Sequence, residues 1–174
     1  MDYLLDEFGL GFILHSENNE IYLNFKRNPD ETKWIALSSS FFGIPGIWYL
    51  AKYVSTPHPL IQPILIYSVL LILTTLFSIN YWRDAQVGWR RNVDLILSKI
   101  TFTVGGLCNL FYVNYLPLKV ATFTVVPFIW YSYRYSSYLT EQSNPEWVTY
   151  HFTFHILLAI GAIFILRGME INKK

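Results

Sequence analysis

Four polar residues within or beside apolar stretches are of the types that a hydrolytic metal site uses. His151 and His155 lie four residues apart at the start of the last long apolar run. Residues at i and i+4 share one face of a helix, and two neutral imidazoles at this spacing can bind one metal ion. A catalytic zinc site needs a third protein ligand and an open position for water, and Asp94 is the natural candidate. The predicted metal ligands are therefore His151, His155 and Asp94.

The same residues suggest a chemistry. A zinc ion lowers the pKa of a bound water toward about 7, which creates a nucleophile. Ser78 could hydrogen-bond that water or a developing oxyanion, so Ser78 and Asp94 are the candidate catalytic residues. An ionisable residue inside a membrane helix costs about 2.5–3.5 kcal/mol on insertion scales, which makes Asp94 a candidate functional residue.

Each of these residues also has a structural interpretation. The histidine pair could be a hydrogen-bonded packing feature at an interface. Asp94 could stabilise the start of its helix through the helix dipole, or could pair with a neighbouring arginine. Ser78 could bond to its own helix or pack against another one, as small polar residues do between membrane helices. The sequence leaves both interpretations open.

The elements that position these residues are membrane helices. Only 14% of the chain is charged and 53% is hydrophobic, whereas soluble domains carry about 25% charged residues. The net charge of +1 leaves no electrostatic footprint for nucleic acid. We expect an integral membrane protein with an all-α fold, a bundle of five transmembrane helices. The expected spans are about 35–53 (with a kink at its Gly-Ile-Pro-Gly segment), 60–80, 93–113, 118–135 and 147–166.

Counting helices places the four polar residues at one membrane face. Five crossings put the N-terminal end on one side (side A) and the C-terminal end on the other (side B). Ser78, Asp94 and both histidines then lie within about two helical turns of side A. Seven Lys or Arg residues fall on side A and five on side B, which weakly favours a cytoplasmic N-terminus. The sequence does not indicate which membrane holds the protein.

Residues 1–34 form a polar surface segment that precedes the transmembrane domain, 35–167, and a short basic tail, 168–174. Alternating apolar and polar residues in 20–25 suggest a β-hairpin on the membrane surface, and an irregular tail is the alternative. The link 81–92 contains two tryptophans and three arginines, which could hold lipid phosphates or simply anchor the loop. The expected partners are the lipid bilayer and proteins that bind the N-terminal segment and this link.

The order of Ser78, Asp94 in the next helix, and His151-x-x-x-His155 in the last helix resembles the CREST superfamily. That group includes alkaline ceramidases and the progestin and adiponectin receptors. The resemblance implies an intramembrane zinc hydrolase of lipid amides or esters, with zinc as its cofactor. Two features depart from the family pattern. Its first histidine falls at position 82, which is Trp82 here, and tryptophan cannot ligate zinc. The family has seven helices, whereas this chain has room for five.

Two functions follow from these observations. The first is a non-catalytic multi-pass membrane protein with a structural or scaffolding role, for example in an organelle membrane or a viral envelope. The second is a CREST-like zinc hydrolase that uses Ser78, Asp94, His151 and His155. The incomplete ligand set and the short loops favour the first.

Overall fold

The computed structural model describes residues 29–85 and 88–172, and this part of the chain folds into five α-helices without a β-strand. The expected all-helical bundle is thereby confirmed. The predicted N-terminal hairpin lies outside the described residues. The helices are α4 (Pro29–Tyr53), α5 (Ile61–Trp82), α6 (Trp89–Tyr112), α7 (Leu116–Glu141) and α8 (Trp147–Ile171).

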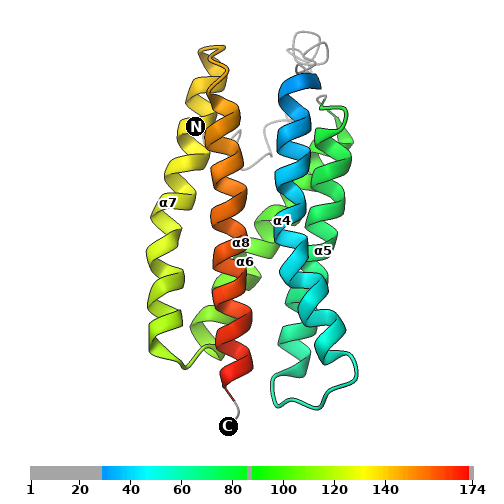
Figure 1. The fold of residues 1–174 in the computed structure, drawn as a ribbon, viewed down its shortest axis with the longest axis vertical. Helices are drawn as coiled ribbons and strands as arrows, with labels where there is room; N and C mark the ends of the chain where they lie inside the picture. Colours follow the sequence, from blue (N-terminus) through cyan, green and yellow to red (C-terminus); the bar gives the residue numbers. More distant parts are fainter. Residues whose placement is uncertain (1–28, 86–87, 173–174) are drawn as a thin grey trace, which may run out of the picture.

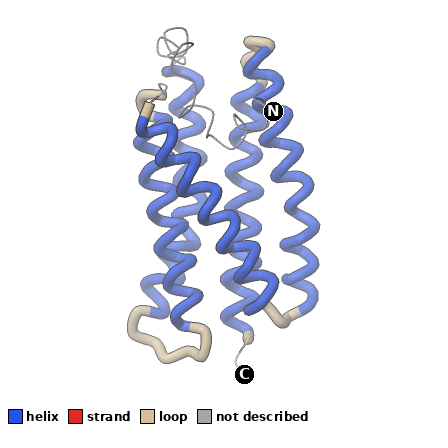
Figure 2. The backbone as a smooth tube through the Cα atoms, turned by 180° about the vertical axis from the view of Figure 1, so that it is seen from behind, coloured by secondary structure: helices blue, strands red, loops and turns tan. Residues whose placement is uncertain are grey.

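Successive helices run in opposite directions along one long axis (Figure 1). Helices α4, α6 and α8 start at the upper end in Figure 1, and α5 and α7 start at the lower end. The upper end therefore corresponds to side A and the lower end to side B. Helices α7, α8, α4 and α5 lie next to one another. Helix α6 lies behind them in Figure 1 and crosses in front of them, from the α5 side to the α7 side, in Figure 2.

Four of these helices, α4, α5, α6 and α8, are long and apolar enough to cross a membrane. Helix α5 is the clearest, with 22 residues and no charged side chain. Helix α7 has 26 residues but is more polar, because it contains Lys119, Arg134 and Glu141. It runs along α8 over the length of the bundle, so the chain forms the alternating pattern of a multi-pass membrane protein (Figure 1).

Helix α4 begins at Pro29, six residues before the expected span. Proline suits the first helical position because its missing N–H would have no partner there. Asp30 and Glu31 follow in the first turn, where negative charge favours the helix dipole. Apolarity alone marks the part of a helix inside the membrane and misses such polar turns. The helix continues through Pro45 to Tyr53.

Helices α4 and α5 approach each other closely at glycine. A Cβ atom added to Gly46 would lie 2.8 Å from the backbone carbonyl oxygen of Ser68, and one added to Gly43 would lie 2.8 Å from Thr75 Oγ1. Only glycine lets the two helices come this close, and small residues have the same role at other contacts between membrane helices. The tight α4–α5 pair brings Ser39 of α4 within 3.0 Å of Ser78 of α5.

A buried carboxylate joins α4 to α8 on side B. Glu170 of α8 accepts hydrogen bonds from the hydroxyls of Tyr49 at 3.2 Å and Tyr53 at 3.1 Å. It also forms ion pairs with Lys52 and Arg167. The two cations are about half exposed, so they can reach water while their carboxylate partner stays buried. On side B, the contact between α4 and α8 is therefore stabilised by the ion pairs of Glu170.

Candidate functional site

His155 lies in a cluster of polar side chains at side A of the bundle. Its side chain in α8 is only 3% exposed. Its Nδ1 atom lies 2.7 Å from Ser38 Oγ and 3.5 Å from Ser39 Oγ, both on α4. A buried imidazole without a hydrogen bond would be costly, so these hydroxyls allow a histidine at this position.

The contacts continue from α4 to α5 and α6. Ser39 Oγ lies 3.0 Å from Ser78 Oγ, and Ser78 in turn lies close to the Asp94 carboxylate. Asp94 is only 7% exposed, and its Oδ1 atom has no hydrogen-bond partner among the described residues. A continuous row of polar side chains therefore connects α8, α4, α5 and α6.

His151 adds α7 to the cluster. Its Nδ1 atom lies 3.3 Å from Ser136 Oγ of α7, and its ring centroid is 4.9 Å from that of His155. Each imidazole thus has a serine of another helix at its Nδ1 atom. Ser78, Asp94, His151 and His155 are brought to one end of the bundle, as helix counting predicts. All five described helices contribute a side chain to this group.

Trp82, at the end of α5, lies against the histidine pair. Its ring centroid is 4.9 Å from that of His151, in an edge-to-face arrangement, and 6.0 Å from that of Trp147. The Trp147 indole donates a hydrogen bond of 2.9 Å to Glu31, which ties the start of α8 to the start of α4. Position 82, where the family pattern has a histidine, is therefore beside the histidine pair in space, and an indole fills it.

Sequence reasoning missed three serines of the cluster. Ser38 and Ser39 belong to a run of three consecutive serines in the first apolar segment, and Ser136 lies near the end of α7. Because hydroxyls inside membrane helices often bond across to a neighbouring helix, the serine run was the available signal. Lys99, which shares α6 with Asp94, is exposed on the outside of the bundle.

A catalytic zinc site needs three protein side chains that reach one metal ion. Among the described residues, no group of three or more His, Cys, Asp and Glu side chains is placed to hold a metal ion. The hydroxyls of Ser39 and Ser78 lie in the row of contacts between His155 and Asp94. As placed, these residues do not form the three-ligand set of a catalytic zinc site, so no chemical step follows from zinc here. His151, His155 and Asp94 as metal ligands stay a prediction.

Alternating apolar helices around a buried polar cluster define the chain as a multi-pass α-helical membrane protein. No protein family, no curated protein and no solved structure matches it.

Proposed function

We propose that this protein is a non-catalytic integral membrane protein with a structural role in a membrane assembly, and that its polar cluster fixes the helices relative to one another. The observation that carries the proposal is that both imidazoles have a serine of a different helix at Nδ1. Ser38 of α4 contacts His155, and Ser136 of α7 contacts His151. A side chain used in this way holds helices together.

The physical basis is the weak drive for helices to associate in lipid. Lipid tails are as apolar as leucine, so close packing and hydrogen bonds between helices must supply the stability. Such hydrogen bonds contribute about 0.6–2 kcal/mol each. Serine contacts to His155 and His151, the Ser39–Ser78 contact and the Thr74–Thr101 contact at 2.6 Å join all five helices in this way. These contacts between helices would fix the bundle in one arrangement, as a structural role requires.

A scaffold also needs a surface for its partners. In this proposal the partners bind the N-terminal segment and the link 81–92, at an organelle membrane or a viral envelope. Trp89, at the end of the link, is 63% exposed, and Arg90 lies 3.7 Å from Asp84 across the link. A photo-crosslinking residue at position 89, in native membranes, is expected to capture a protein partner. The same residue at position 163, an exposed position on α8, serves as the control.

The role of the cluster is tested with a His151→Ala/His155→Ala double variant of the purified protein. We expect a lower unfolding temperature in detergent, because the serines lose their partners. We also expect equal, background-level hydrolysis of a ceramide-like amide by the variant and the wild type. Hydrolysis that depends on the histidines would contradict the structural proposal.

The second candidate function is the CREST-like hydrolase of lipid amides or esters. Its support is that Ser78, Asp94 and His155 meet on one side of the bundle, and that the Asp94 Oδ1 atom is buried without a described partner. Buried polar groups are rarely left so unless water, an ion or a ligand contacts them. Metal analysis decides between the candidates. Close to one zinc ion per chain, lost in the double variant, together with turnover, would establish the hydrolase.

A further inference from the structure

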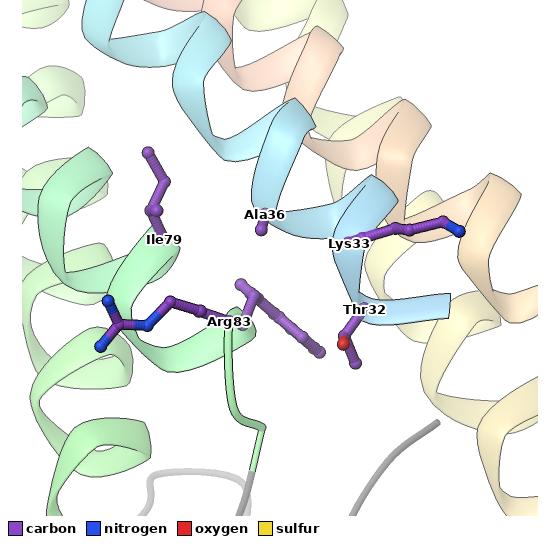
Figure 3. A pocket seen from close by; sticks show the side chains of 6 residues that line it. Thr32, Lys33, Ala36, Ile79 and Arg83 are labelled. Atoms are coloured by element: carbon purple, nitrogen blue, oxygen red, sulfur yellow. The ribbon is translucent and has the colours of Figure 1, made fainter. Parts of the chain in front are cut away.

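A groove of about 230 Å³ lies between α4 and α5 on side A of the bundle (Figure 3). Its floor is apolar, because the Trp82 indole, Ala36 and Ile79 line it. Trp82 is also the residue that contacts His151 on the other side, so one indole separates the groove from the histidine pair. The groove is lined by Thr32, Lys33, Ala36, Ile79, Trp82 and Arg83.

Two cations border this apolar floor from opposite helices. Lys33 belongs to α4 and its side chain is 57% exposed, and Arg83, directly after α5, is exposed as well. Figure 3 shows their side chains on the two sides of the groove, with the two charged ends pointing away from each other. Lys33 pairs with Asp30 at 2.9 Å, but Asp30 is 83% exposed, and a pair in contact with water is easily exchanged for another anion.

The depth of the groove suits a lipid headgroup. Trp82 is the last residue of α5, and tryptophan concentrates where the hydrocarbon meets the headgroups. Lys33 lies one turn into α4, and Arg83 follows the end of α5, so both long side chains can reach the level of lipid phosphates. Arginine also matches the geometry of a phosphate with two parallel hydrogen bonds.

We propose that this groove binds one anionic phospholipid, with the exposed side chains of Lys33 and Arg83 turning toward each other to hold its phosphate and the start of an acyl chain lying over Ala36 and Ile79. The volume is below the range of about 300–1,000 Å³ that encloses a whole small molecule. The groove therefore holds the headgroup and the first part of one chain, and the rest of the lipid stays in the bilayer. A headgroup without a cation of its own suits the two basic side chains, so phosphatidylglycerol should bind more tightly than phosphatidylcholine.

Native mass spectrometry of the full chain in detergent, titrated with phosphatidylglycerol, tests this proposal. Lys33→Gln and Arg83→Gln should each weaken binding about fivefold, since one interfacial cation contributes roughly that factor. Ala36→Leu keeps both charges but fills the floor, and it should weaken binding too. Arg134→Gln is the matched control, because it removes one cation on the same side of the membrane but on α7.

The outcomes separate a lipid site from general surface charge. Equal weakening by Arg134→Gln, or no weakening by the Lys33 and Arg83 variants, would overturn the proposal. Inorganic phosphate at the lipid concentration should not displace phosphatidylglycerol, and full displacement would show that the acyl chain plays no part. If a Gln variant does not fold, Lys33→Met or Arg83→Met takes its place, with the same expected loss.

Discussion

Ser38 is the residue on which the buried histidine depends most directly. Removing its hydroxyl in Ser38→Ala takes the closest partner from His155 Nδ1, 2.7 Å away. Ser39 Oγ, 3.5 Å away, is then the nearest hydroxyl to this nitrogen. Because one hydrogen bond contributes about 0.5–1.5 kcal/mol, we expect a loss of that size in the free energy of unfolding. Reversible unfolding in mixed detergent micelles measures it.

The neighbouring serine provides the control for this prediction. Within residues 29–85 and 88–172, the only hydrogen bond of Ser40 Oγ goes to the carbonyl oxygen of Leu37 in its own helix, at 2.6 Å. Ser40→Ala should therefore change the free energy of unfolding by less than about 0.5 kcal/mol. Equal effects of the two substitutions would show that the contact with His155 adds no stability.

Trp82 decides whether the histidine pair can become a three-ligand site. Its ring lies 4.9 Å from that of His151, which in turn contacts His155, so an imidazole at position 82 would stand beside His151. Trp82→His should therefore retain more zinc per chain after purification than the wild type, as measured by elemental mass spectrometry.

A second tryptophan gives the comparison for that measurement. Trp89, exposed at the start of α6, is replaced in Trp89→His, which adds a histidine away from the pair. This variant should bind no more zinc than the wild type. Equal zinc contents in the Trp82 and Trp89 variants would count against the resemblance to the CREST pattern.

At the scale of helices, the α4–α5 contact depends on Gly46. A Cβ atom at this position would lie 2.8 Å from the backbone oxygen of Ser68, which cannot turn aside as a side chain can. Gly46→Ala should therefore push the two helices apart and lower the free energy of unfolding by about 1–3 kcal/mol. Gly106→Ala on α6 meets nothing within 4 Å and should leave stability almost unchanged. Similar stabilities of the two alanine variants would contradict this account of the helix pair.

The positions of the helices could be predicted from the sequence, because a run of about 20 apolar residues needs little else to form a membrane helix. Their ends were harder to predict. Helix α4 starts at Pro29 and α8 continues to Ile171, beyond the expected limits of 35 and 166. Where a helix continues into the headgroup region its residues are polar, so a search for apolar runs does not detect that part of the helix.

At the scale of the whole molecule, helix counting predicted which polar residues meet. Ser78, Asp94, His151 and His155 come to one end because the helices alternate in direction (Figure 1). The lateral order of the helices could not be predicted, since apolar helices carry no pairing code in their composition. For that reason the contacts of His155 with Ser38 and of His151 with Ser136 were not predicted.

The alternating helices also make a prediction about the membrane. With α4 starting on side A and α8 ending on side B, the first and last described residues face opposite sides of the bilayer (Figure 2). A protease site inserted directly before Pro29 and a second one after Asn172, tested in sealed vesicles, should be cut from opposite faces. Cleavage of both sites from the same face would show that one helix, α7 above all, does not cross.

The central claim is that the polar cluster exists to hold the helices together. A double-mutant cycle between Ser38→Ala and His155→Phe, read as the free energy of unfolding in bicelles, tests it most directly. Phenylalanine keeps a ring in the buried site, so the cycle isolates the coupling between the hydroxyl and the imidazole. The structure predicts a favourable coupling of about 0.6–2 kcal/mol between α4 and α8. A coupling near zero in variants that remain folded would contradict the claim.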